Sequence, residues 1–190
     1  MLSPQELETL KTSAMGAGAT HVARIRADEI VVRDDLARLC REGCGNHGQS
    51  ASCPPHVAGP GGFRKMLEQF RQAFVVRMEV PVESLYSIAS QDLFRLLHEV
   101  VAAIEKSAKD LGYTRAQAFA GGPCKQLFCR EQPDCARIAG GACRHPDIAR
   151  PSMSGFGIDV AKLSQKAGWG DAPAQGPDGM ASLYGLVLIG

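Results

Sequence analysis

Hydrophobic residues along this chain recur with helical and strand periods that alternate from one end to the other. Residues 90–111 carry the clearest helical pattern, because apolar side chains fall three or four positions apart and Gly112 follows where the helix would end. Residues 183–189 are almost continuously apolar, which is typical of a strand in the middle of a sheet. The two segments predict one long helix packed on a central strand.

The remaining elements predicted by the pattern are shorter. The sequence Ser3-Pro4-Gln5-Glu6 is a capping box with proline at the first helical position, and it predicts a helix that ends near Gly16. We expect further helices over residues 34–40, 63–70 and 159–168, strands over 21–26, 74–80 and 116–120, and loops over 59–62 and 171–179. The helix over 34–40 is expected to bring Leu36 and Leu39 into the core.

These elements fit one domain over residues 1–190. At 190 residues, with 45% hydrophobic and 22% charged residues, the chain can bury a substantial core. Because about four strands alternate with helices, we expect a mixed α/β fold, with α+β also open, in which one sheet is covered by helices. The pattern does not give the order of the strands.

The net charge and the apolar segments of the chain indicate which kinds of partner to expect. The chain has 21 basic and 20 acidic residues, so the basic excess of a general nucleic-acid binder is missing. The first residues include acids and lack the apolar stretch of a secretory signal, and no apolar run approaches the ~20 residues that span a bilayer. We therefore expect a cytoplasmic protein with no nucleic-acid or membrane partner; the sequence does not indicate its oligomeric state.

The seven cysteines lie in two short segments. The first cysteine window holds Cys40, Cys44 and Cys53, and the second cysteine window holds Cys124, Cys129, Cys135 and Cys143. Thiolates that converge repel one another unless a metal or a disulfide compensates. An odd number cannot pair fully, and cysteine clusters in the cytoplasm more often bind metal than form disulfides. The seven cysteines are therefore the candidate metal ligands.

The second cysteine window favours an iron–sulfur cluster over zinc. Four sulfurs suffice for a [4Fe-4S] cluster or for a tetrahedral zinc ion. Zinc sites usually use two tight C-x(2–4)-C pairs, whereas the gaps here are four, five and seven residues. Basic residues near these cysteines would offset the thiolate charge, or would serve only as surface residues: Lys125, Arg130, Arg137, Arg144 and Arg150.

The first cysteine window has only three sulfurs. A metal bound there keeps a coordination position for substrate, unless His47 or His56 supplies the fourth ligand. Another interpretation is that one or two of these thiols are simply buried. Three protein sulfurs leave one position on the metal open, whereas four do not. We therefore expect the first window to be the reactive site, and the second window to store electrons or to stabilise the structure.

Several segments of the chain resemble a family known only as predicted metal-binding proteins, domain-of-unknown-function family 2284. These segments are CREGCGNHGQSASCPP, GPCKQLFC, CRHPDIARPSMSGFGIDV and the terminal LYGLVLI. The resemblance covers residues 22–189. It implies that all seven cysteines belong to the metal-binding pattern of the family, and it implies an anaerobic or microaerobic microbial setting.

Two functional hypotheses follow. The first is an iron–sulfur protein with one or two [4Fe-4S] clusters, which transfers electrons to or from a redox partner protein, or uses an open iron as a catalytic site. The alternative is a zinc-stabilised binding module without catalysis, in which the metal contributes folding energy. Thiolates suit both metals, so the sequence leaves both hypotheses open.

Overall fold

The computed structural model of the chain describes residues 2–170 and 179–190. The helices are α1 (Pro4–Gly16), α2 (Asp34–Gly43), α3 (Gly59–Leu67), α4 (Val82–Leu85), α5 (Ser90–Asp110), α6 (Cys124–Phe128) and α7 (Val160–Lys166), with the 3-10 turns η1 (Ala27–Glu29) and η2 (Met153–Phe156). The strands are β1 (His21–Arg26), β2 (Gln72–Pro81), β3 (Ala116–Phe119) and β4 (Met180–Ile189). The mixed α/β prediction is confirmed.

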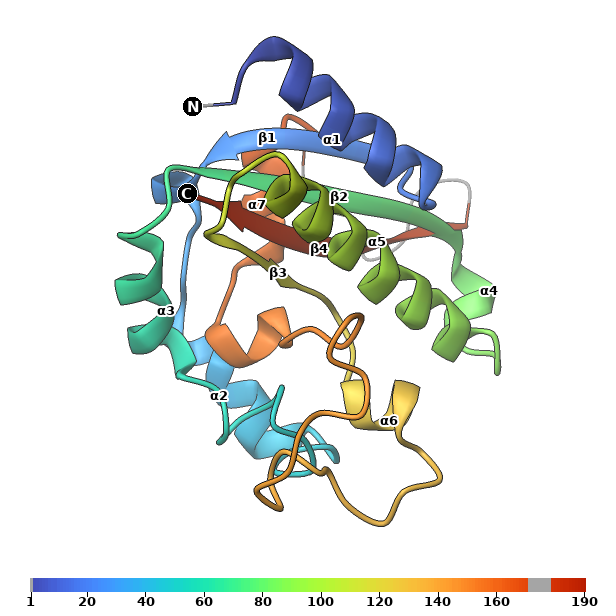
Figure 1. Ribbon diagram of the computed structural model, residues 1–190. Coiled ribbons are helices and arrows are strands. Elements are labelled where there is room, and N and C mark those ends of the chain that lie inside the picture. Colours follow the sequence, from blue (N-terminus) through green and yellow to red (C-terminus); the bar gives the residue numbers. More distant parts are fainter. Residues whose placement is uncertain (1, 171–178) are drawn as a thin grey trace.

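The strands of the described residues form one sheet in the order β1-β2-β4-β3, and each neighbouring pair is antiparallel. The terminal strand β4 lies between β2 and β3, as its continuous apolar run predicted (Figure 1). It pairs with β2 along its whole length, from Met180 opposite Pro81 to Ile189 opposite Gln72. The C-terminal strand therefore holds the two halves of the sheet together.

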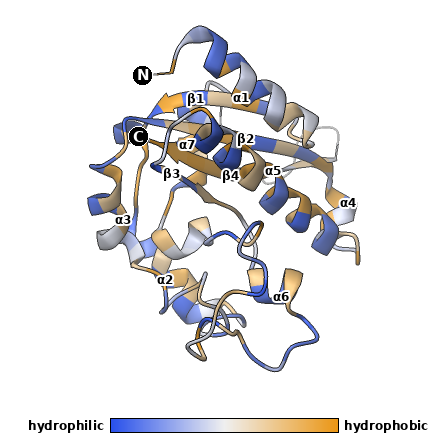
Figure 2. Cartoon of the chain, viewed as in Figure 1, coloured by the Kyte–Doolittle hydropathy of each residue, from blue (hydrophilic) through white to orange (hydrophobic). Residues whose placement is uncertain are grey.

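Helices cover both faces of this sheet. Helices α1 and α5 lie on one face, where Phe74 and Val76 of β2 join their core. Ala73 and Val75 point to the other face and join a second core with residues of α3, η2 and α7. Because side chains alternate along a strand, β2 contributes to both cores. Figure 2 shows the apolar strands between the more polar outer surfaces of the helices.

The predicted starts of helices α1 and α7 are confirmed. Ser3 caps α1: its hydroxyl accepts from the Glu6 N–H at 3.3 Å, while its own N–H donates to the Glu6 carboxylate at 2.7 Å. Asp159 caps α7 by accepting from the Lys162 N–H at 3.0 Å. The loop expected over 171–179 falls, apart from Gly179, outside the described residues. In the described part of the chain, no helix has the length and apolar character needed to cross a bilayer.

Two expectations for the segment around the first cysteine window were wrong. Helix α2 runs on to Gly43 and buries none of its side chains fully; Leu39 is 61% exposed rather than part of the core. The physical reason is position: α2 lies beyond the sheet and packs on α3 and η2, so no strand covers its apolar side (Figure 1). The run at 59–62, expected to be a loop, forms the first turn of α3.

Gly185 marks the closest approach of the long helix to the sheet. A Cβ atom at Gly185 would lie 2.4 Å from Val101 Cγ1 and 3.3 Å from Leu97 Cδ1, both in the core. We predict that Gly185→Ala lowers the free energy of unfolding by about 1–3 kcal/mol, because α5 must shift to admit the methyl group.

Urea unfolding of Gly185→Ala beside Gly61→Ala tests this prediction. Gly61 has no atom within 4 Å of its virtual Cβ, so its alanine variant should unfold at the wild-type urea concentration or slightly above it. Equal stabilities for the two variants would contradict the close packing of α5 on β4.

Candidate metal centre

The two cysteine windows, far apart in the sequence, meet at one end of the molecule. In Figure 1 the loop after α2 lies beside α6 and the long loop that follows it, below the sheet. Hydrogen bonds join these segments: the Ser152 N–H donates to the Ser52 carbonyl at 3.0 Å, and the Gln126 amide donates to Gln49 at 3.2 Å. The fold thus gathers the cysteine-rich loops into one region.

The first cysteine window begins on helix α2 and continues into a tight loop. Cys40 lies on the helix, Cys44 caps its C-terminus and is exposed, and Cys53 is buried at 8% exposure. Burial raises the pKa of the Cys40 thiol, and the nearby thiols of Cys44 and Cys53 raise it further. Cys40 therefore lies near both other thiols of its window.

Cys124 connects the second cysteine window to the first. It is the first residue of the short helix α6, which the sequence pattern did not reveal. The Ser52 hydroxyl donates to Cys124 Sγ at 2.9 Å and lies 3.9 Å from Cys53 Sγ. Burial raises the pKa of Cys124, the hydroxyls of Ser52 and Ser50 lower it, and the charges of Cys53 and Cys135 raise it again. Thiols from both windows thus act on one another.

Backbone N–H groups are directed at two further sulfurs. The His145 N–H donates to Cys143 Sγ at 3.4 Å. Burial raises the pKa of Cys135, but hydrogen bonds from the backbone of Ala51, Ile138 and Arg137, together with the charge of Arg144, outweigh burial and leave the pKa of this thiol below its usual value. Such donors stabilise a thiolate, which is the form that binds metal.

The basic side chains of the second cysteine window have different roles. Arg144 binds the Asp134 carbonyl at 3.0 Å and helps to lower the pKa of Cys135, as charge compensation requires. Lys125 donates to the Gln132 carbonyl at 3.0 Å and so closes its own loop. Arg130 and Arg137 are exposed. Arg150 makes the buried contacts described below.

The two histidines proposed as rival ligands lie in the loop of the first window. His56 is exposed, with Nε2 3.3 Å from the Gly48 carbonyl, and the His47 N–H donates to the Cys44 carbonyl at 3.1 Å. Among the described residues, no three His, Cys, Asp or Glu side chains are placed to hold a single metal ion. All seven cysteines are free thiols. Ligation by either histidine stays a prediction.

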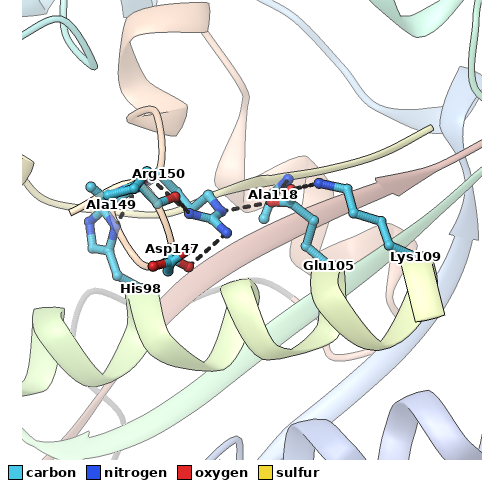
Figure 3. Close-up of polar contacts among 8 residues, drawn as sticks. His98, Glu105, Lys109, Ala118, Asp147, Ala149 and Arg150 are labelled. Carbon is cyan, nitrogen blue, oxygen red and sulfur yellow. Dashed lines mark hydrogen bonds and ion pairs between the residues drawn. The ribbon is translucent and has the colours of Figure 1, made fainter. Parts of the chain in front are cut away.

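A buried ion pair fastens the loop after Cys143 to the rest of the fold (Figure 3). Arg150 Nε donates to Glu105 Oε2 on α5 at 2.7 Å, and both side chains are about nine-tenths buried. The Arg150 guanidinium also donates to the carbonyls of Pro146, Asp147 and Ala149 at 2.9–3.1 Å. One side chain thereby fixes the backbone of the loop that carries Cys143.

Glu105 and His98 complete this anchor from helix α5. The second donor to Glu105 Oε2 is the N–H of Ala118 on the edge strand β3, at 3.0 Å, and Lys109 pairs with Oε1. His98 is fully buried, and its Nδ1 accepts from the Arg150 N–H at 3.0 Å. The sequence pattern did not reveal that Arg150, Glu105 and His98 form this anchor. The available signal was a glutamate and a histidine on the otherwise apolar stripe of a helix.

A groove of about 880 Å³ opens beside the first cysteine window. Cys40 and Cys44 line it together with Leu36, Leu39 and Ile158. The exposed apolar side of α2 therefore borders two of the thiols, so that a molecule in the groove would touch them.

The fold and this region together define an α/β protein with a thiol-rich end built from two cysteine windows. The chain belongs to the family described as Predicted metal-binding protein (DUF2284), which matches residues 23–189 and confirms the resemblance seen in the sequence. No curated protein and no solved structure matches the chain. The donor chemistry fits the metal that the family description implies, because Cys124 and Cys143 are soft sulfur ligands that accept from the Ser52 hydroxyl and the His145 N–H.

We predict that Arg150→Met lowers the free energy of unfolding by about 3–5 kcal/mol, because it leaves the buried Glu105 carboxylate without its main partner. Arg26→Met is the matched control: it removes an exposed ion pair with Asp28 and should change stability little. Urea unfolding measures both. Equal effects from the two variants would show that the anchor does not stabilise the fold.

His98 predicts a specific dependence of stability on pH. Burial lowers the pKa of His98 to about 4, whereas an unfolded histidine titrates near pH 6.5. Between these values the unfolded chain binds a proton that the folded chain does not. The stabilisation is therefore complete above pH 6.5 and is lost as the pH falls, by about 3 kcal/mol at pH 4.

The His98→Gln variant isolates this contribution. Glutamine keeps an acceptor for the Arg150 N–H but does not titrate, so the stability difference between wild type and variant should shrink from pH 7 to pH 4.5. Other titrating groups, including the thiols, cancel in that difference. A difference that stays constant with pH would contradict the buried neutral imidazole.

Proposed function

We propose that the protein binds one or two [4Fe-4S] clusters through its seven cysteines and serves as an electron carrier for a redox partner protein. Thiolates are the usual ligands of such clusters, and both windows are rich in them. When bound, a cluster of this kind accepts and returns single electrons. The residues of the chain bind it, shield it and set its potential.

The observation that carries the proposal is the set of hydrogen-bond donors aimed at sulfur. Ser52 Oγ donates to Cys124 Sγ at 2.9 Å, and the His145 N–H donates to Cys143 Sγ at 3.4 Å. Donors of this kind lower the electron density on ligating sulfurs, and they are one of the levers that set the reduction potential of a cluster. A zinc ion held only for stability has no redox state to tune.

The exposure of the first cysteine window supports an electron-transfer role. Cys44 is exposed, and the groove lined by Cys40 and Cys44 borders the exposed Leu39. A cluster on these thiols would lie near the surface, where a partner protein can approach it closely. The apolar side of α2 offers that partner an uncharged contact, while the buried Cys53 shields the inner side.

The metal content of anaerobically purified protein tests the proposal. We expect brown protein with iron and acid-labile sulfide in equal amounts, whose visible absorbance bleaches in air and on reduction. Colourless protein that contains zinc and no sulfide would overturn the redox role and leave a zinc-stabilised binding module. The cells are grown with both iron and zinc in the medium, so that the metal found in the protein reflects its preference and not the supply.

A further inference from the structure

We propose that Cys53 and Cys124, one from each cysteine window, bind the same metal unit. Cys124 then completes a four-sulfur set with Cys40, Cys44 and Cys53, and Cys129, Cys135 and Cys143 form a second set of three. The inference rests on the proposed metal binding, but it does not depend on which metal is bound. It reverses the division expected from the sequence, in which each window serves its own site.

Ser52 supplies the first argument, because its hydroxyl holds the two sulfurs together. Ser52 Oγ lies 2.9 Å from Cys124 Sγ and 3.9 Å from Cys53 Sγ, so the two sulfurs are at most 6.8 Å apart, the sum of these distances. Ligands of one tetrahedral zinc ion lie only about 3.8 Å apart, as Zn–S bonds of about 2.3 Å require. Ligands of a cluster bind different irons and are spaced more widely, so a separation of at most 6.8 Å admits both a single ion and a cluster.

Helix α6 supplies the second argument, because it separates the first two cysteines of the second window. Cys124 is its first residue and Cys129 follows its last, and the Cys129 N–H still donates to the Lys125 carbonyl at 2.9 Å. Five helical positions place two residues about 7.5 Å apart along the axis and about 140° apart around it. The two side chains therefore leave the helix in different directions, and the Cys124 sulfur is the one that contacts Ser52.

The loop between Ser50 and Cys53 is held firmly enough to define this geometry. Ser50 is buried at 1% exposure, and its hydroxyl lies 2.9 Å from Ser52 Oγ. The Ser52 carbonyl accepts from the Ser152 N–H at 3.0 Å, on the segment that Arg150 anchors. The anchor on α5 thus extends through this loop to the thiols of both windows.

The remaining thiols agree with two neighbouring units. Cys40 and Cys44 line one groove at the end of α2, and Cys53 lies in the loop that follows this helix, which groups the three on one side. Cys143 accepts from the His145 N–H at 3.4 Å, in the loop that Arg150 anchors, and the Ser152 N–H just beyond that loop donates to the Ser52 carbonyl at 3.0 Å, so the second set borders the first. Cys129, Cys135 and Cys143 are left with three protein sulfurs, and the open coordination position then belongs to the second window instead of the first.

Metal content of serine variants tests the shared unit. We expect Cys53→Ser and Cys124→Ser to lose the same amount of metal and the same spectral component, and the double variant to lose no more than either single one. Cys129→Ser is the matched control, and it should keep that component and lose another. Circular dichroism confirms that each variant compared is folded.

Two results would overturn the inference. In the first, Cys124→Ser and Cys129→Ser lose the same spectral component and Cys53→Ser loses a different one. Each window would then hold its own metal site. All three variants losing everything together would indicate one undivided site. Metal analysis of the same samples keeps the two proposals apart: zinc in place of iron and sulfide would refute the redox role, whereas the grouping of the cysteines would still be decided.

Wild-type holoprotein gives a second measurement that needs no variant. Metal is withdrawn slowly with a chelator in the presence of iodoacetamide, and mass spectrometry follows alkylation of each cysteine. Thiols that share a unit are released together, so Cys53 and Cys124 should be alkylated at one common rate and Cys129 at another. Alkylation of Cys124 in step with Cys129 and Cys143, or of all seven together, would refute the shared unit.

Discussion

The buried carboxylate of Glu105 is the contact on which the arrangement of this molecule depends. It receives hydrogen bonds from the edge strand β3, from Lys109 on its own helix and from Arg150 on the cysteine-bearing loop. A charge in the interior is tolerated only when it is paired and its remaining lone pairs are satisfied. Because Ala118 and Arg150 come from parts of the chain distant from α5, the carboxylate fixes α5, the sheet and that loop relative to one another.

The two ends of the molecule are stabilised by different physical means. The sheet is stabilised by two apolar cores, one on each of its faces. At the cysteine end α2 has no fully buried residue, and the loops are held by hydrogen bonds such as those of Ser52 and Arg150. Metal binding would add its free energy where hydrophobic burial is weakest, which is a common use of metal in small structural regions.

This division suits an electron carrier. The sheet and α5 form a rigid support, and the anchor at Arg150 transmits that rigidity to the loops that bear the thiols. When the ligands of a metal unit are already held in place, they need to move little as the unit gains or loses an electron. In the proposed arrangement two metal units would lie side by side, because Ser52 contacts Cys53 of one window and Cys124 of the other.

The sequence by itself determined the main elements and the chemical character of the site. Capping at Ser3, the apolar stripe of α5 and the continuous apolar run of β4 are local signals, and the elements they predicted are present. The clustering of seven cysteines likewise indicated metal binding, in agreement with the family description, while ligation by the cysteines stays a prediction. Only the tertiary structure decided which thiols face one another, because that depends on the turn of α6, on Ser52 reaching across 72 positions to Cys124, and on the distant pairing of Glu105 with Arg150. The same reason explains the error at Leu39: a helical pattern predicts an apolar face, but it cannot say whether a sheet lies beneath that face.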